Sequence, residues 1–150
     1  MTKSIESQIQ SLKLEAVSYK KLEDYSKAES CILKALQLKP EDNSLNHELA
    51  KIYFKIGKYP DCLELLLTLS DKIKRRQILF KDIAMCYYKM NEMEKSLEAV
   101  QHSLSENPNS TSSLYVEGLI QKELGNFQQS ISSFTKLLKL DPENRDALYQ

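Results

Sequence analysis

Hydrophobic side chains recur along this sequence with the spacing of an amphipathic helix. Residues three or four positions apart share one helical face, because each residue turns the chain by about 100°. One run of such positions is Asn46, Leu49, Ala50, Tyr53 and Ile56. A second run is Ser130, Ile131, Phe134, Leu137 and Leu138. Both runs predict helices with one buried side, and the scarcity of Gly and Pro favours helix along most of the chain.

The pattern returns along the chain with a 34-residue period. Shifting the sequence by this length against itself produces one column of small residues, Ala16, Ala50, Ala84 and Gly118. A second column of small residues is Ala28, Cys62, Ser96 and Ser130. Small side chains on two helices allow the helix axes to come close. The periodicity therefore predicts four consecutive units, which are residues 9–42, 43–76, 77–110 and 111–144.

Each unit is predicted to hold two antiparallel helices joined by a tight turn. Gly57, Asn91 and Gly125 follow the first helix of three units, where a left-handed residue is needed and Gly or Asn supplies it most readily. Glu23 takes this place in the first unit. Three units end in a proline, which suits the first turn of a following helix. These residues are Pro40, Pro108 and Pro142. The predicted fold class is all-α.

This organisation resembles the tetratricopeptide repeat family, whose 34-residue unit consists of helix, turn and helix with small residues and a proline at these positions. The resemblance covers residues 9–144 and departs from the family pattern at Glu23 and at Lys74, where the second unit lacks its proline. It implies a right-handed α-solenoid of antiparallel helix pairs, with four tandem repeats in a single array over residues 1–150. Residues 145–150, RDALYQ, begin a further helix, which favours a longer repeat protein over a short terminal cap.

Charge and cysteine content narrow the class of protein. The 150-residue chain has 21 basic and 21 acidic residues, so net charge favours neither a nucleic acid nor an acidic surface as partner. Cys31, Cys62 and Cys86 form no CxxC pair, which disfavours a disulfide framework and a zinc site. The beginning, MTKSIESQIQ, has no apolar signal core, and the run CLELLLTL is too short to span a bilayer. These features predict a soluble protein of the cytoplasm or the nucleus, without cofactor or metal.

In the family that this sequence resembles, the first helix of each unit lines a concave groove. The matching positions hold the lysines Lys13, Lys20, Lys21, Lys51, Lys55, Lys81, Lys89 and Lys122. The acidic residues at these positions are Glu48, Asp82 and Glu123. The excess of lysine predicts a basic groove that attracts a partner of acidic character. The alternative is that the lysines near helix ends only complement the carbonyl end of the helix dipole.

Apolar residues share the groove positions and are candidates for anchoring a ligand. They are Leu14, Val17, Phe54, Met85, Tyr88, Tyr115, Val116 and Leu119. Phe54, Tyr88 and Tyr115 are the preferred anchors, because a few aromatic residues supply most of the energy of a typical interface. For several of these residues, packing against adjoining units is the alternative. The predicted partner-binding groove consists of Lys13, Val17, Lys51, Phe54, Lys55, Lys81, Met85, Tyr88, Lys89, Tyr115, Leu119 and Lys122.

The best-known activity of the family is a carboxylate clamp, in which Lys, Asn and Arg side chains hold the acidic C-terminus of cytosolic heat-shock chaperones. Lys13 matches the first lysine of the clamp, but Val17 and Glu48 stand where the clamp has asparagines. Ile78 and Asp82 stand where the clamp has its last two basic residues. Because Glu48 and Asp82 would repel a carboxylate, the sequence argues against this activity.

The sequence therefore predicts a non-enzymatic scaffold or adaptor that binds a peptide or helix of another protein. Neither His47 nor His102 has a carboxylate or cysteine arranged around it as a catalytic set. One alternative is a nucleic-acid-binding helical repeat, although the groove lacks arginine, the better phosphate ligand. Another alternative is self-association through the C-terminal repeat. The residues that would lack a covering helix there are Ile131, Phe134 and Leu138.

Overall fold

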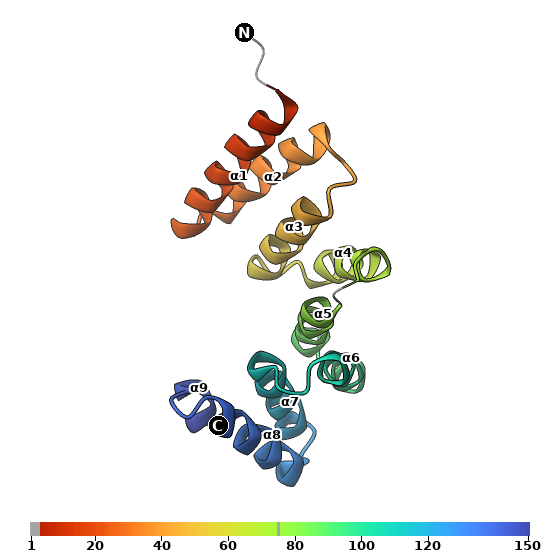
Figure 1. Ribbon diagram of the computed structural model, residues 1–150, viewed down its shortest axis with the longest axis vertical. Coiled ribbons are helices and arrows are strands. Elements are labelled where there is room, and N and C mark those ends of the chain that lie inside the picture. The colour runs from red at the N-terminus through yellow and green to blue at the C-terminus, as the bar shows by residue number, and fades with distance from the viewer. Residues whose placement is uncertain (1–3, 75) are drawn as a thin grey trace. The chain divides into compact units, whose positions relative to one another are not determined.

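The computed structural model describes residues 4–74 and 76–150, and within these ranges every regular element is a helix (Figure 1). The order is α1 (Ile5–Lys21), α2 (Tyr25–Leu38), α3 (Asn43–Lys55), α4 (Tyr59–Lys72), α5 (Gln77–Lys89), α6 (Met93–Glu106), α7 (Thr111–Glu123), α8 (Phe127–Leu140) and α9 (Arg145–Leu148). This arrangement confirms the all-α prediction. None of the helices in the described ranges combines the length and the apolar character that a bilayer span requires.

The chain forms two compact units, Met1–Leu69 and Ser70–Gln150. The helices α1, α2 and α3 and most of α4 belong to the first unit, and α5 to α9 belong to the second. Helix α1 starts ahead of residue 9, where the first repeat was predicted to begin, because Ser4 caps it and accepts a hydrogen bond from the Ser7 amide at 3.2 Å. The division into four repeats of equal length in a single array stays a prediction.

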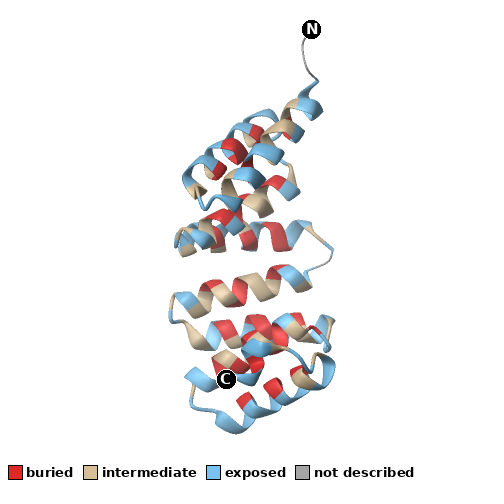
Figure 2. Cartoon of the chain, turned by 90° about the vertical axis from the view of Figure 1, so that its left-hand side faces the viewer, coloured by how far each residue is buried: buried red, intermediate tan, exposed pale blue. Residues whose placement is uncertain are grey.

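The core of the first unit lies between α1, α2 and α3. Ala16 and Ala28, from the two columns of small residues, are 1% and 0% exposed. Ile32, Leu45 and Leu49 are buried in the same cluster. Figure 2 shows buried positions on one side of these helices and exposed positions on the other. The hydrophobic periodicity of the sequence thus marks the sides that the helices bury.

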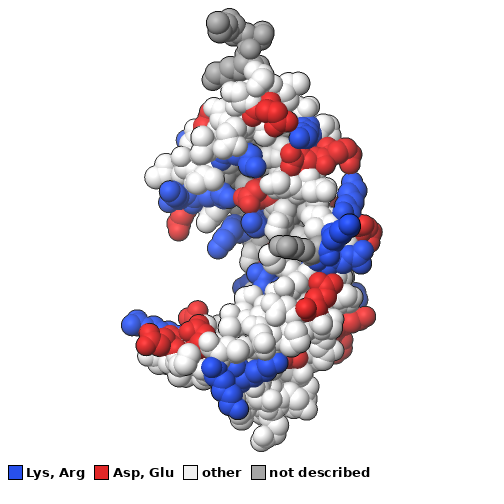
Figure 3. All heavy atoms as spheres, viewed as in Figure 1, with Lys and Arg blue, Asp and Glu red and all other residues white. Residues whose placement is uncertain are grey.

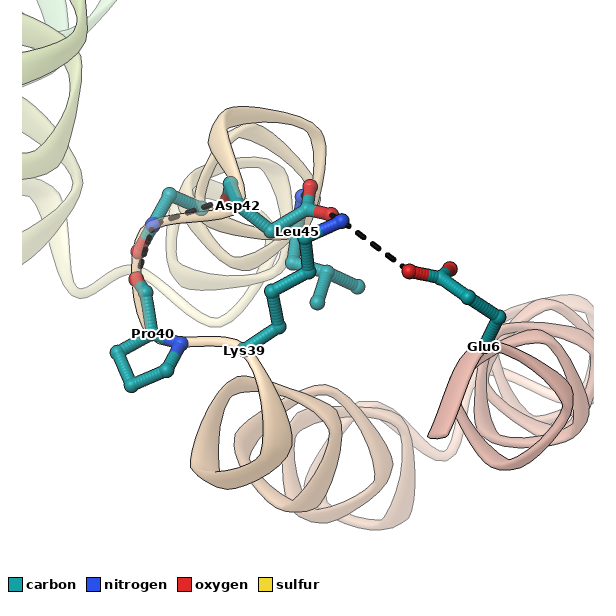
Figure 4. A network of polar contacts seen from close by, with 6 residues as sticks. Glu6, Lys39, Pro40, Asp42 and Leu45 are labelled. Carbon is teal, nitrogen blue, oxygen red and sulfur yellow. Dashed lines mark hydrogen bonds and ion pairs between the residues drawn. The ribbon is translucent and has the colours of Figure 1, made fainter. Parts of the chain in front are cut away.

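Polar contacts fix the start of α3 (Figure 4). The Leu45 amide donates to the Asp42 carboxylate at 3.0 Å, so Asp42 caps the helix. Lys39, which follows α2, lies 3.8 Å from the same carboxylate. The Lys39 ammonium also reaches Glu6 of α1, with 3.3 Å between Nζ and Oε1. Side chains from α1 and from the loop between α2 and α3 therefore hold the first turn of α3 in place.

In the second unit, serine hydroxyls enter the close contacts between helices. Ser96 of α6 donates to the Ala84 carbonyl of α5 at 2.6 Å, and Ser130 of α8 donates to the Gly118 carbonyl of α7 at 2.9 Å. Ser96 is 0% exposed and Ser130 is 5% exposed. A buried hydroxyl costs little when it is hydrogen-bonded. The small-residue columns therefore supply polar links as well as close packing.

A chain of buried hydroxyls also joins α5, α6 and α7. Ser110 caps α7 and donates to the Ser113 hydroxyl at 3.1 Å. The Ser113 and Ser103 hydroxyl oxygens are 2.8 Å apart, and Ser103 donates to the Gln77 carbonyl at 2.8 Å. Ser103 and Ser113 are both 0% exposed. The contact between α6 and α7 is therefore held by hydrogen bonds in its interior.

The last helices correct the prediction that Ile131, Phe134 and Leu138 lack a covering helix. Phe134 is 7% exposed and Leu138 is half-buried, and both lie in a cluster that includes Ala147 of α9. The Phe134 ring fits because Gly118 leaves space for it: a Cβ on Gly118 would lie 2.5 Å from Phe134 Cζ. Of the three residues, Ile131 alone is exposed, with 58% of its surface accessible.

The turns inside the helix pairs adopt the left-handed conformation that the sequence predicts. The angle φ is +81° at Gly57, +78° at Gly125, +60° at Asn91 and +58° at Glu23. The Glu23 turn is closed by the Asp24 amide, which donates to the Tyr19 carbonyl at 2.9 Å. Glu23 thus bears a steric cost that Gly would avoid.

We expect Glu23→Gly to raise the free energy of unfolding of the first unit by about 0.5–1 kcal/mol, because Gly relieves the clash of Cβ in the left-handed region. Glu23→Ala is the matched control, since it removes the carboxylate but keeps Cβ. Urea unfolding followed by circular dichroism would compare the variants. Equal stability of Glu23→Gly and Glu23→Ala would show that backbone strain is not the cause.

Candidate functional site

In the first unit, the predicted groove residues come from α1 and α3. Phe54, the preferred anchor of this unit, is half-buried, and its ring meets Tyr59 edge to face with 5.3 Å between the centroids. Part of the Phe54 surface is therefore committed to packing within the chain. Of the other groove residues of this unit, Val17, Lys51 and Lys55 are exposed and Lys13 is half-buried.

The Glu48 carboxylate offsets part of the lysine charge on this side of the first unit. Its two oxygens pair with Lys20 at 2.7 Å and with Lys51 at 3.0 Å. Burial raises the pKa of the Glu48 carboxyl, but the hydrogen bonds from Lys20 and Lys51 outweigh burial and hold that pKa below its ordinary value. On the face drawn in Figure 3, acidic side chains likewise lie beside basic ones in both units. The lysine count alone thus overstates the free positive charge.

In the second unit, α5 carries the predicted groove residues Lys81, Met85, Tyr88 and Lys89. The Lys81 ammonium lies 2.7 Å from the carboxylate of its neighbour Asp82, and these two side chains are 28% and 22% exposed. Met85 and Tyr88 are half-buried and Lys89 is exposed. Lys81 therefore already has a partner, whereas Lys89 has no ion-pair partner among the described residues.

Tyr88 makes a contact with α7 that the sequence did not reveal. Burial raises the pKa of the Tyr88 hydroxyl, and the Glu123 carboxylate, which accepts a hydrogen bond from it, raises this pKa further. The Tyr88 hydroxyl therefore keeps its proton beside the Glu123 carboxylate. Tyr88 is nevertheless only half-buried, which leaves part of its surface accessible to a ligand.

The groove residues of α7 differ in how accessible they are. Tyr115 is half-buried and meets the Phe134 ring edge to face, with 5.9 Å between the centroids. Leu119 is half-buried, and Lys122 is exposed and donates to the Gln150 side chain at 3.1 Å. Val116, counted above among the apolar residues at groove positions, is only 4% exposed. For Val116, packing was the correct alternative.

A pocket of about 340 Å³ opens between α5, α7 and the start of α9. Three of its lining residues belong to the predicted partner-binding groove, and they are Lys81, Met85 and Tyr115. The others are Thr111, Ser112, Val116, Asn144 and Asp146. Asn144 and Asp146 were missed because the segment after Pro142 was interpreted only as the start of a further helix. The 34-residue register offered a signal, since it aligns Asp146 with Ser112.

The histidines and cysteines do not form a reactive cluster in the described ranges. His102 stacks on Phe80 with 4.0 Å between the ring centroids, which gives it a packing role. Cys31, Cys62 and Cys86 are buried, and no disulfide bond joins them within the described residues. No group of three or more His, Cys, Asp or Glu side chains suited to a metal ion occurs among residues 4–74 and 76–150.

A family model described as the tetratricopeptide repeat matches residues 9–42 and 111–144, the ranges predicted above for the first and fourth units. The human FK506-binding protein-like is 30% identical over 90 residues, which are 59% of this chain and 26% of the relative. The chain thus spans about a quarter of the length of that curated relative.

Solved structures of helical repeat proteins resemble the chain in fold. MamA from Desulfovibrio magneticus RS-1 superposes with a TM-score of 0.81 at 19% identity, over 95% of this chain and 78% of MamA. YrrB, described as a TPR protein with an unusual peptide-binding site, gives 0.77 at 18% identity, over 89% and 69%. The first TPR of Spaghetti (RPAP3), bound to the HSP90 peptide SRMEEVD, gives 0.69 at 18% identity, over 73% and 86%.

Proposed function

Because this chain belongs to the tetratricopeptide repeat family, we propose that it is a non-enzymatic adaptor of the cytoplasm or nucleus that binds a peptide or helix of a partner protein. The observation that carries the proposal is the set of half-buried apolar side chains on α5 and α7, helices that also carry lysines. They are Met85, Tyr88, Tyr115 and Leu119. Aromatic and sulfur-containing side chains of this kind supply most of the energy of peptide recognition.

Lysines at the predicted groove positions of each unit give the partner its proposed acidic character. Lys55 and Lys89 are exposed at the ends of α3 and α5 and have no ion-pair partner among the described residues. Lys13 is half-buried on α1, again without an ion-pair partner in the described ranges. Unpaired ammonium groups attract acidic residues and raise the association rate at low ionic strength. In the second unit, we therefore place an acidic residue of the ligand near Lys89. Lys13 and Lys55 would make contacts of the same kind with a ligand of the first unit.

The peptide-binding description of YrrB and the bound peptide of the RPAP3 domain support a role in peptide recognition. The carboxylate clamp is not part of the proposal. Glu48 stands at a clamp position, and its carboxylate is held in place by Lys20 and Lys51. A ligand carboxylate at this point would meet a negative charge that has already taken the nearby ammonium groups.

Tyr88→Ala is expected to weaken a bound peptide by about tenfold to thirtyfold, because it removes an aromatic anchor from the centre of the surface. The probe is a fluorescein-labelled peptide chosen from a displayed peptide library by selection on the full chain, and fluorescence polarisation measures its affinity. Phe127→Ala is the matched control, since Phe127 is an aromatic residue of α8 that is 63% exposed and lies outside the proposed surface. Equal affinities for the two variants, or a library that yields no binding peptide, would count against the proposal.

Self-association is a second candidate, favoured by apolar residues at the end of the second unit. Phe127, Ile131 and Leu148 are 63%, 58% and 58% exposed. Their counterparts two repeats earlier in the 34-residue register include Tyr59 and Leu63, which are half-buried. A second copy of the chain would bury this apolar surface in the way that neighbouring repeats of a solenoid bury theirs. Light scattering on the eluting chain at rising concentration is expected to show a mass above that of the monomer, and a constant monomer mass would exclude this candidate.

A further inference from the structure

The pocket between α5, α7 and α9 has an apolar wall and room for a side chain of modest size. Its volume of about 340 Å³ lies at the lower end of the range for ligand pockets, about 300–1,000 Å³. Met85, Tyr115 and Val116 supply the apolar wall. Val116 is buried, whereas Met85 and Tyr115 keep part of their surface accessible. An aliphatic or methionine side chain of a peptide matches this wall.

Several polar groups of the pocket already have partners. Lys81 pairs with Asp82 at 2.7 Å, and this pair is mostly shielded from solvent. The Asn144 amide donates to the Asp141 carboxylate at 3.1 Å, and its oxygen accepts from the Ala147 amide at 3.0 Å. The Lys81 charge is therefore offset, and Asn144 is committed to capping α9.

Asp146 is the charged group of the pocket that remains available. Its side chain is exposed, and it has no ion pair or hydrogen bond among the described residues. With Lys81 offset by Asp82, the uncompensated charge at the pocket is negative. This local charge is opposite to the one that the lysine count of the leading helices predicts.

We infer that this pocket takes an apolar side chain of the partner peptide that is followed or preceded closely by a lysine or arginine. The apolar side chain packs on Met85 and Tyr115, and the cationic side chain pairs with Asp146. The inference rests on the proposed peptide-binding function and deepens it. Lys89, at the far end of α5 from the start of α7, would still favour an acidic residue, so the ligand carries a positive charge at the pocket and a negative charge away from it.

The test is a selection from a phage library of random peptides, about ten residues long, on the full chain and on three variants. Asp146→Asn removes the charge and Asp146→Lys reverses it. Glu143→Lys is the matched control, since Glu143 is an exposed acidic residue close to Asp146 in the sequence that does not line the pocket. Synthetic copies of the enriched peptides, labelled with fluorescein, then give affinities by fluorescence polarisation.

Peptides enriched on the unmodified chain are expected to combine Leu, Ile or Met with a nearby Lys or Arg. Their affinity should fall by about threefold for Asp146→Asn and about tenfold for Asp146→Lys, and change by less than about twofold for Glu143→Lys. Enriched peptides that are acidic beside the apolar residue, or equal losses in Asp146→Lys and Glu143→Lys, would overturn this inference and leave the proposed function standing. A selection that enriches no peptide would overturn both.

Discussion

Replacing Gly118 with alanine is expected to lower the free energy of unfolding of the second unit by about 1–2 kcal/mol. The new Cβ would lie 2.5 Å from Phe134 Cζ and 2.7 Å from both Cε atoms of the ring. Phe134 is 7% exposed and packs on Tyr115, so its ring has little room to move away. Overpacking of this kind costs about 1–3 kcal/mol, and the better helix propensity of alanine returns less than about 1 kcal/mol.

The 34-residue register supplies the compensating change. Gly118 and Phe134 occupy the places that Ala50 and Leu66 occupy two repeats earlier, and those two residues are 0% and 1% exposed. At both places a small residue is paired with a large one. The earlier repeat pairs Ala with Leu, and the last repeat pairs Gly with Phe. The double variant Gly118→Ala with Phe134→Leu is expected to recover stability relative to the Gly118→Ala variant. Urea unfolding measures both, and strictly additive losses would contradict the pairing.

Ser113→Leu is expected to destabilise the second unit by about 2–3 kcal/mol. Ser113 is 0% exposed, and its hydroxyl oxygen lies 2.8 Å from that of Ser103 and 3.1 Å from that of Ser110. Leucine would remove both hydrogen bonds and force a larger side chain into the contact between α6 and α7. Chemical denaturation followed by the circular dichroism signal of helix would give the loss.

The first unit indicates which second change should relieve this loss. Ala35 and Leu45 stand there in the places of Ser103 and Ser113, and both are 0% exposed. Adding Ser103→Ala to Ser113→Leu rebuilds that apolar pair and is expected to recover at least half of the lost stability. Ser132→Leu is the control for an added leucine, since Ser132 of α8 is exposed and this change should alter stability by less than about 0.5 kcal/mol. If Ser132→Leu is as damaging as Ser113→Leu, the buried hydroxyl chain is not the cause.

Helix positions and turns were predictable because local physics determines them. The left-handed turns at Gly57 and Gly125 follow from residue type, and Ala16 and Ala28 are buried where two helices approach. The burial of Phe134 was not predictable from periodicity. It depends on the absent side chain of Gly118 and on α9, whose contacts join residues that are distant in the sequence.

The candidate site was predictable in part of its residues but not in its charge. Periodicity placed Lys81, Met85 and Tyr115 on one side of their helices, and all three line the pocket. Periodicity does not predict which lysine ammonium groups form ion pairs with carboxylates, because ion pairing depends on side-chain rotamers. Lys81 with its neighbour Asp82 and Glu48 with its two lysines are the examples that change the electrostatic picture.

The hydroxyl chain through Ser103 and Ser113 has a thermal consequence. Exposure of apolar surface on unfolding increases heat capacity, whereas exposure of polar surface decreases it. The contact of α2 with α3 buries Ala35 and Leu45, but the contact of α6 with α7 buries hydroxyl groups in their places. Per unit area, the serine-containing contact should contribute a flatter curve of stability against temperature, so that cooling weakens it less than it weakens its aliphatic counterpart.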